Sequence, residues 1–481
     1  MEIDIQSLYQ QLPQVGEFLD GAQGKELQRR YPRPFVLDAV RFILTAMREE
    51  IASGVLNDKT LTVALSNLAE RVEQRLQMAD PAALRPVINA TGVILQTNLG
   101  RAPLSEAAIE RIAAVSRGYC NLEFDLESGE RGRRGGHVED LLLRLVGLAS
   151  PGHSALIVNN CAAATFLALN SLAEGGEVIV SRGELVEIGG GFRVPEILRK
   201  SGARLVEVGT TNRTRLEDYA AAITSETRLI LRVHRSNFQI VGFTEEAELR
   251  DLVKLGSDAG VPVVVDQGTG CVLRPGEFGL SPQSSLLENS HSGAALVCAS
   301  GDKLLGGPQC GIIVGESGPV RRLRVNPLHR AFRVDKLTLA ALEATLLAYL
   351  SGQAEAIPVV GMISQSADAI RTRCERWAAA LCSAKVKSEA IATQSAVGGG
   401  TTPGATLPSF AVALESHYMK ATELAALLRR LEPPVIARIH NDQVLLDLRT
   451  VPEFEDDLIL RMLSQAFESK ATRETAGTGT Q

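Results

Sequence analysis

Hydrophobic and polar residues follow two different periods along this chain. Near its beginning, apolar residues recur in a stripe that comprises Val36, Leu37, Val40, Ile43, Leu44, Met47 and Ile51. This spacing predicts an amphipathic helix. A second helix is expected from about Leu61 to Met78, with Thr60 as its N-cap. From Val87 to about Asp335, short apolar runs alternate with helical patterns, which is typical of a mostly parallel sheet wrapped by helices.

These patterns divide the chain into four parts. We expect a helical N-terminal module at residues 1–80, a large α/β domain at 81–335, a small α+β domain at 336–470 and a polar, disordered tail at 471–481. The link between the module and the large domain begins at Ala79 and ends near Pro86.

The small domain is expected to begin with a long helix from about Lys336 to Leu350 and to contain strands near Val435–Ile439 and Val444–Leu448. The segment Ser395–Thr406 has the most disordered composition, because three consecutive glycines and a Pro-Gly pair permit no regular element. Glycine-rich turns are expected in the large domain at Gly189–Gly191 and Gly268–Gly270.

Composition and charge narrow the class of protein. The chain of 481 residues carries a formal net charge of −6, which argues against indiscriminate binding to nucleic acid, DNA included. No apolar run reaches the roughly 20 residues that a membrane-spanning helix needs, and the first residues lack the features of a secretory signal. Seven cysteines without a Cys-x-x-Cys pair and seven histidines without ligand spacing indicate a cytoplasmic protein and no metal site.

Lys303 stands at the beginning of a glycine-containing loop between two apolar runs, Ala294–Cys298 and Gly311–Val314. A lysine at the end of a strand can reach an aldehyde cofactor, and Gly306 and Gly307 leave room for it. Pyridoxal 5'-phosphate (PLP) needs such a lysine, with which it forms a Schiff base. Taken alone, an exposed loop lysine is the simpler interpretation; three further features favour PLP.

The first feature is Asp266, which ends the β-branched run Val261–Val265. Such a run predicts a strand buried on both faces of a parallel sheet, and its carboxyl end lies on the ligand-binding edge. PLP needs a carboxylate there, because this group keeps the pyridine nitrogen protonated. An aspartate that only caps the turn at Gly268–Gly270 is an equally good local interpretation.

The second feature is the turn Asn160-Cys161-Ala162, which lies between a short apolar run and a helix expected to end at Ala173. The free amides and positive dipole end of a helix attract anions, and small residues let a phosphate approach closely. Alanine-rich helix starts are common, so this signal depends on the other two.

The third feature is a set of arginines near the ends of expected elements: Arg101, Arg134, Arg330 and Arg333. The planar guanidinium group suits tetrahedral oxyanions and carboxylates. Most arginines are solvated surface charges, and only the glycine-rich or turn-like surroundings of these four favour binding.

Arg41 and Arg48 lie seven residues apart, on the side of the first expected helix opposite its apolar stripe. A basic helix face of this kind is a candidate surface for RNA, although a solvated helix face is the simpler interpretation.

Several long runs carry a resemblance to one family. They are Leu84–Asn89, Thr97–Arg101, Ser181–Gly190, Glu207–Thr214, Ser300–Gln309 and Asp335–Glu343. Through them, and over essentially its whole length, the chain resembles the bacterial selenocysteine synthases, the L-seryl-tRNA(Sec) selenium transferases.

The resemblance implies a fold-type-I PLP enzyme of the aminotransferase-like class, with Lys303 holding the cofactor. It implies that seryl-tRNA(Sec) loses its hydroxyl to give dehydroalanyl-tRNA, to which selenium from selenophosphate is then added. Arg101, Arg330 and Arg333 match the selenium-donor pocket, and Arg134 and Asp302 match positions beside the active site. Asp302 is expected to supply or relay a proton to the departing hydroxyl; the alternative is that it only orders its loop or pairs with an arginine.

The resemblance also implies an N-terminal module that contacts the tRNA and a homo-oligomer, a decameric ring of dimers with sites at subunit interfaces. One departure is visible. Cys161 stands where the family usually has asparagine, which puts a side-chain contact to the phosphate in doubt.

Two other functions compete with this one. A PLP-dependent lyase or transferase of a free small amino acid or amino sugar acid would share the residues around Lys303. A non-catalytic RNA-binding scaffold would have no need of Lys303, Asp266 and the arginines together.

Overall fold

The computed structural model describes residues 5–78, 84–188, 191–272, 285–382, 386–416 and 419–477. The chain divides into two compact units, residues 1–86 and residues 87–481. The link expected after Met78 and the turn expected at Gly189–Gly191 lie largely outside the described residues.

The first unit is helical. Its helices are α1 (Ile5–Gln10), α2 (Val15–Asp20), α3 (Ala22–Arg30), α4 (Arg33–Ala52), α5 (Asp58–Ser66) and α6 (Leu68–Met78). The apolar stripe predicted from the sequence lies on α4, where Val36, Leu44 and Met47 are completely buried. These side chains form a core with residues of the other five helices, so the first helix is confirmed.

The second predicted helix differs from the structure in two ways. It begins at Asp58 and is interrupted at Asn67, which gives the separate helices α5 and α6. Its cap is Asn57 and not Thr60: the Asn57 Oδ1 atom accepts from the backbone N–H of Thr60 at 3.2 Å, and the Asn57 N–H donates back to Thr60 Oγ1 at 2.8 Å. This reciprocal pair satisfies donors that the first helical turn leaves free.

The second unit contains a seven-stranded sheet. In spatial order its strands are β2 (His153–Val158), β12 (Gly311–Glu316), β11 (Leu296–Ser300), β10 (Val263–Asp266), β8 (Thr227–Val233), β3 (Glu177–Ser181) and β6 (Arg204–Val208). All neighbours from β11 to β6 are parallel, and only β12 runs antiparallel to both of its neighbours. The mostly parallel sheet predicted from the sequence is confirmed.

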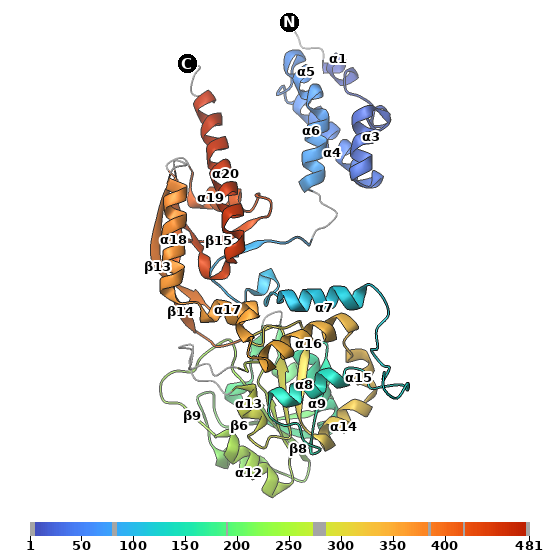
Figure 1. Cartoon of the computed structure of the whole chain (residues 1–481), viewed down its shortest axis with the longest axis vertical. Helices are drawn as coiled ribbons and strands as arrows, with labels where there is room; N and C mark the ends of the chain where they lie inside the picture. The colour runs from blue at the N-terminus through green and yellow to red at the C-terminus, as the bar shows by residue number, and fades with distance from the viewer. Residues whose placement is uncertain are drawn as a thin grey trace. The chain divides into compact units, whose positions relative to one another are not determined.

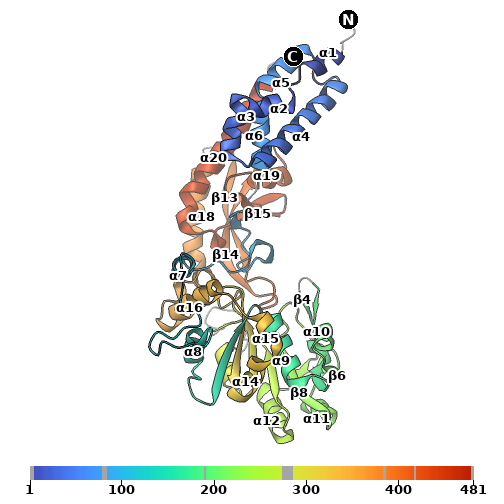
Figure 2. The same cartoon turned by 90° about the vertical axis from the view of Figure 1, so that its right-hand side faces the viewer.

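Helices cover both faces of this sheet (Figures 1 and 2). One face carries α9 (Cys161–Ala173), α10 (Val194–Lys200) and α14 (Ser317–Val325). The other carries α8 (Gly136–Leu145), α13 (Leu286–Ser290) and α16 (Lys336–Leu350). The remaining elements of this domain are η1 (Thr97–Leu99), α7 (Glu106–Ser116), η2 (Arg182–Glu184), β4 (Glu187–Ile188), β5 (Phe192–Arg193), β7 (Arg213–Thr214), α11 (Leu216–Ala222), β9 (Glu245–Glu246), α12 (Leu249–Ala259) and α15 (Pro327–Phe332).

A second, five-stranded sheet forms the C-terminal domain. Its strands, in spatial order, are β1 (Ile88–Ala90), β15 (Val435–His440), β16 (Gln443–Asp447), β14 (Thr406–Glu415) and β13 (Lys387–Ala396). They are accompanied by η4 (Ala354–Ala356), α17 (Pro358–Ser364), α18 (Ala367–Cys382), α19 (Ala421–Leu428), η5 (Leu448–Thr450), η6 (Glu453–Glu455) and α20 (Asp456–Gly477). The helix and the two strands predicted for this part of the chain are confirmed as α16, β15 and β16.

The packing does not follow the expected domain boundaries at two places. β1 comes before the large domain in the sequence but pairs with β15, from Ile88↔Val435 to Ala90↔Ala437. Conversely, α16 packs against α7 and α8 of the large domain (Figure 1).

Two segments expected to be disordered have a defined structure. Ser395 is completely buried at the end of β13, and β14 begins at Thr406. The nine residues between these strands, 397–405, form a loop that we call the glycine loop. The helix α20 continues through residues 471–477, a stretch in which alanine, arginine and glutamate favour the helical backbone; residues 478–481 lie outside the described residues.

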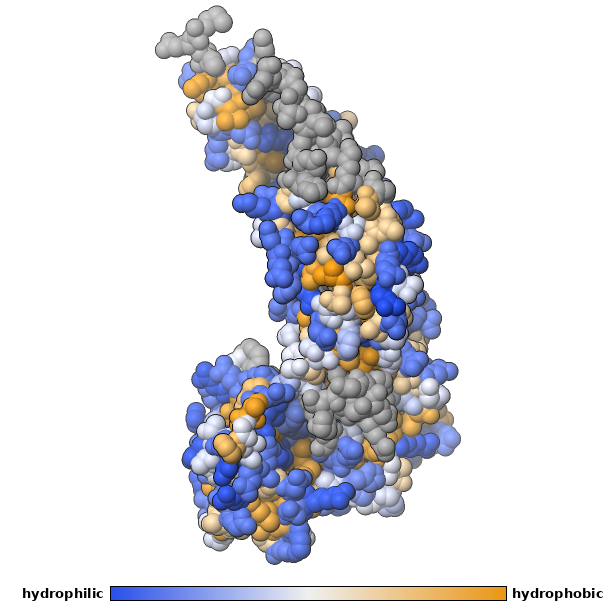
Figure 3. Space-filling model, turned by 90° about the vertical axis from the view of Figure 1, so that its left-hand side faces the viewer, coloured by the Kyte–Doolittle hydropathy of each residue, from blue (hydrophilic) through white to orange (hydrophobic). Residues whose placement is uncertain are grey.

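None of the described helices is long and apolar enough to cross a membrane. The face of the molecule drawn in Figure 3 is mainly hydrophilic, with hydrophobic patches scattered between the polar residues.

Candidate active site

Lys303 lies just beyond the carboxyl end of β11 and is buried, with 8% of its surface exposed. Its loop is fixed through the backbone: the Leu304 N–H donates to Thr269 O at 3.0 Å, and the Gly306 N–H donates to Lys303 O at 2.9 Å. Within the described part of the chain, no hydrogen bond or ion pair engages the Lys303 ammonium group. A buried amine without a fixed partner is free to react with an aldehyde.

Asp266 ends β10, one strand away from β11 in the sheet, and its carboxylate is buried. The hydroxyl of Thr165 donates to its Oδ2 atom at 3.0 Å, and the thiol of Cys161 donates to its Oδ1 atom at 3.5 Å. Burial raises the pKa of Asp266 above its usual value, while the hydrogen bond from Thr165 and the charge of Lys303 oppose this effect.

Asn160, Cys161 and Ala162 lie where α9 begins. Asn160 is the N-cap, and its Oδ1 atom accepts from the Ala163 N–H at 2.8 Å. No described residue accepts from the backbone N–H groups of Cys161 and Ala162, which leaves two donors at the positive end of a helix dipole.

The side chain of Cys161 turns toward Asp266. Burial raises the pKa of this thiol well above its usual range, so it remains protonated and donates a hydrogen bond. A cysteine at this position therefore leaves the two backbone donors in place and adds a neighbour to the carboxylate.

These groups fit PLP. Among the described residues, Lys303 supplies the positive charge that opposes the effect of burial on the Asp266 carboxylate, and a protonated pyridine nitrogen would add a second. The free amides of α9 would receive the phosphate group, and Lys303 would hold the aldehyde carbon.

The four predicted arginines fall into two groups. Arg101 pairs with Asp302, the neighbour of Lys303, through a 2.7 Å contact between its Nη1 atom and Asp302 Oδ2. Arg101 has a positive φ of 65°, a conformation that is uncommon outside glycine and that often marks functional positions. The pairing agrees with the second of the two roles considered for Asp302.

Arg134, Arg330 and Arg333 line a different cavity of about 460 Å³ together with Glu123. The Arg134 Nε atom lies 2.7 Å from Glu123 Oε1, and Arg333 Nη1 lies 3.9 Å from the same oxygen. Hydrogen bonds from Arg134 and Arg131 lower the pKa of Glu123. Among the described residues, no hydrogen bond or ion pair joins Arg101 to the residues that line this cavity.

The sequence did not indicate Thr165 or His234. His234 follows β8, and its backbone N–H donates to Asp266 O at 2.9 Å. Its Nε2 atom lies 3.1 Å from Thr401 O of the glycine loop; a carbonyl only accepts, so Nε2 carries the proton. Burial lowers the pKa of His234, which keeps the ring neutral. The only available signal was its place after an apolar run, the same signal that indicated Asp266.

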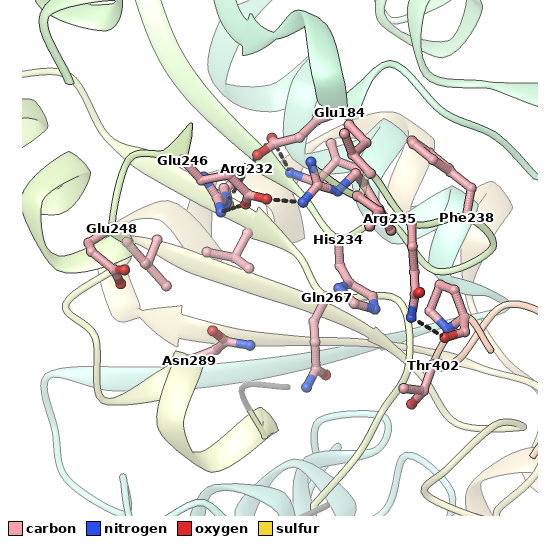
Figure 4. A pocket seen from close by; sticks show the side chains of 17 residues that line it. Glu184, Arg232, His234, Arg235, Phe238, Glu246, Glu248, Gln267, Asn289 and Thr402 are labelled. Carbon is pink, nitrogen blue, oxygen red and sulfur yellow. Dashed lines mark hydrogen bonds and ion pairs between the residues drawn. The ribbon is translucent and has the colours of Figure 1, made fainter. Parts of the chain in front are cut away.

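A cavity of about 380 Å³ opens beside His234 (Figure 4). One side is formed by the paired side chains of Glu184, Arg232 and Glu246, and the other by Gln267 and Thr402. Among the residues that the structure describes, no group of histidine, cysteine and acidic side chains could hold a metal ion.

This chain matches two family models and shares its fold with a solved structure. The family model described as "L-seryl-tRNA selenium transferase" matches residues 87–452, and that of "Selenocysteine synthase N terminal" matches residues 9–48. Among solved structures, a D-glucosaminate-6-phosphate ammonia-lyase shares the fold, with a TM-score of 0.56 and 21% identity over 82% of this chain and 98% of that one.

Two curated relatives are similar over nearly their whole length. The L-seryl-tRNA(Sec) selenium transferase of Aquifex aeolicus (strain VF5) is 44% identical over 456 residues, which cover 94% of this chain and 97% of the relative. The protein of the same name from Geobacter sulfurreducens is also 44% identical, over 95% of this chain and 99% of the relative. The chain therefore belongs to the L-seryl-tRNA(Sec) selenium transferase family.

Proposed function

We propose that this chain converts L-seryl-tRNA(Sec) to L-selenocysteinyl-tRNA(Sec), with PLP as its cofactor and selenophosphate as the selenium donor. The observation that supports this most is the meeting of three groups at one sheet edge: the buried amine of Lys303, the buried carboxylate of Asp266 and the free amides at the start of α9. These three groups support PLP chemistry in general, and membership of the family indicates which substrate that chemistry acts on.

The residues divide the work as follows. Lys303 would hold the cofactor, and its amine would take the proton from the α-carbon of the seryl group. Asp266 holds the proton on the ring nitrogen, with Thr165 and Cys161 orienting its two oxygens. When bound, PLP supplies an electron sink that lets the seryl group lose its α-proton and then its β-hydroxyl.

The arginines serve two purposes. Arg330 and Arg333 hold the phosphoryl oxygens of selenophosphate, with Arg134 in the same cavity. Arg101, fixed by Asp302, carries positive charge beside Lys303. The cytoplasmic location remains a prediction from the cysteine pattern, and the ring of dimers remains a prediction from the resemblance.

The test supplies seryl-tRNA(Sec) and selenophosphate to the purified protein and analyses the amino acid on the tRNA. Selenocysteine is expected from the wild type and none from Lys303→Ala, which should also lose the borohydride-reducible adduct of the cofactor. Efficient turnover of free serine, with none of seryl-tRNA(Sec), would instead favour a lyase of free amino acids.

A further inference from the structure

The glycine loop, residues 397–405, crosses from the C-terminal domain to the large domain. The ring of His234 donates to Thr401 O at 3.1 Å, and the Gln239 side-chain amide donates to Pro403 O at 2.6 Å. At the other end of the loop, Gly398 packs so closely on Leu95 that a Cβ atom would lie 2.6 Å from Leu95 O. These contacts explain why a segment of such composition has a fixed conformation.

Gly400 brings this loop to the reactive lysine. It is buried and has a φ of +78°, and a Cβ atom at this position would lie 3.2 Å from Lys303 Nζ. The backbone of the loop is therefore one wall of the space around the lysine amine.

The loop presents hydrogen-bond donors that the protein does not use. No described residue accepts from the backbone N–H groups of Gly399 and Gly400. The hydroxyl of Thr402, a residue with 4% of its surface exposed, has no hydrogen-bond partner among the described residues, whereas the neighbouring Thr401 hydroxyl donates to Gly398 O at 2.6 Å. Burying an unpaired hydroxyl is unfavourable, so a missing partner is indicated at Thr402.

The chemistry of that partner follows from the donors and their place. N–H and hydroxyl groups suit an acceptor oxygen, and the loop contains no lysine or arginine to balance a negative charge. A substrate amine that reaches the position of Lys303 Nζ has its acyl carbon two bonds away, so the acyl oxygen comes within reach of the loop at Gly400. An uncharged carbonyl oxygen meets both conditions.

We propose that the glycine loop binds the carbonyl oxygen of an aminoacyl ester through the N–H groups of Gly399 and Gly400 and the hydroxyl of Thr402. The proposal rests on the proposed function, in which the serine is esterified to tRNA. It supplies a physical reason for the site to accept that ester, whose carbonyl oxygen needs hydrogen-bond donors but no balancing cation.

The test titrates the PLP-loaded enzyme with L-serine methyl ester and, separately, with L-serine, following the absorbance of the cofactor. The wild type should bind the ester more tightly. Thr402→Val should weaken ester binding about 2- to 10-fold, the range for one hydrogen bond, and leave the binding of free serine unchanged. Thr402→Ser, which keeps the hydroxyl, should behave as the wild type.

Thermal unfolding is a check on the variant, because removing an unpaired buried hydroxyl should leave the melting temperature unchanged or raise it. A second measurement needs only the wild type: serinol, which lacks the carbonyl group, should bind more weakly than the ester. Equal binding of serinol and ester, or equal losses for ester and free serine in Thr402→Val, would overturn the proposal. These titrations need no tRNA. A failure to convert seryl-tRNA(Sec) would therefore refute the proposed function, while the binding of the ester would still decide whether the glycine loop holds a carbonyl oxygen.

Discussion

At the scale of the residue, the carboxylate of Asp266 at the end of β10 is oriented by hydrogen bonds from two side chains of the helix α9. Cys161 and Thr165 lie one helical turn apart on α9, so that both side chains face the same carboxylate. One carboxylate oxygen accepts a hydrogen bond from the Thr165 hydroxyl and the other accepts one from the Cys161 thiol, and together these bonds fix the plane of the carboxylate.

Thr165→Val should weaken PLP binding about 10-fold or more, because it removes a hydrogen bond to a charged group, worth roughly 1.5–3 kcal/mol. Equilibrium dialysis of PLP against the variant measures this effect. Thr165→Ser keeps the hydroxyl and should restore most of the affinity; an equal loss in both variants would mean that packing, and not the hydrogen bond, is responsible.

The raised pKa of Asp266 also has a consequence for stability. In the cofactor-free protein, the folded state binds a proton at Asp266 more tightly than the unfolded chain does. Proton binding at Asp266 therefore stabilises the folded state. This stabilisation is fully present below the ordinary aspartate pKa of 3.8, and it is lost as the pH rises through the higher pKa that Asp266 has in the folded protein. Asp266→Asn should flatten that part of the profile, measured by urea unfolding of both cofactor-free proteins, and parallel profiles would contradict the assignment.

At the scale of the element, the glycine loop is held by its neighbours more than by its own sequence. Gly400 and Gly404 both have positive φ values, +78° and +71°, so alanine strains the backbone at either position by a similar amount. They differ in what a methyl group would meet: Lys303 Nζ at 3.2 Å for Gly400, and the Gln239 side chain at 3.6 Å for Gly404.

Gly400→Ala should therefore displace the lysine amine and slow the formation of the borohydride-reducible PLP adduct by on the order of tenfold, since small misplacements of a reacting group are costly. Gly404→Ala is the matched control and should form the adduct at nearly the wild-type rate. Similar rates in the two variants would show that only loop strain matters.

The parts of the site that could be predicted from the sequence, Asp266 and Lys303, are those that follow a recognisable local pattern. An apolar strand ends at Asp266 and another just before Lys303, and each is followed by glycine-rich turns. Thr165 and His234 carry no such mark, because a threonine in an apolar helix and a histidine after a strand acquire a role only when the fold packs. The glycine loop was mistaken for a disordered segment for the same reason, since its partners His234 and Gln239 lie more than 150 residues earlier in the chain.

At the scale of the whole molecule, the N-terminal unit has a core of its own. Its helix α4 keeps Arg41 and Arg48 exposed, on a flank of the helix outside the buried stripe. This is the surface that the sequence suggested for tRNA.

Replacing both Arg41 and Arg48 with glutamate should weaken the binding of tRNA(Sec) by roughly tenfold or more, because phosphate contacts supply much of the affinity for RNA and the substitutions reverse their charge. Filter binding at fixed salt measures this effect, while the absorbance of bound PLP should not change. Arg429 and Arg430 are likewise exposed, and reversing their charges is the matched control. Unchanged affinity in the first variant would exclude α4 from tRNA binding.

The pairing of β1 with β15 joins residues 88–90 to residues 435–437 in one sheet. The large domain is thus inserted between two neighbouring strands of the C-terminal domain. During synthesis on the ribosome, β1 emerges early and has to wait for almost the whole of the remaining polypeptide before its partner strand is made. For the same reason, a protease that nicks an exposed loop of the large domain would leave two fragments that this sheet still holds together.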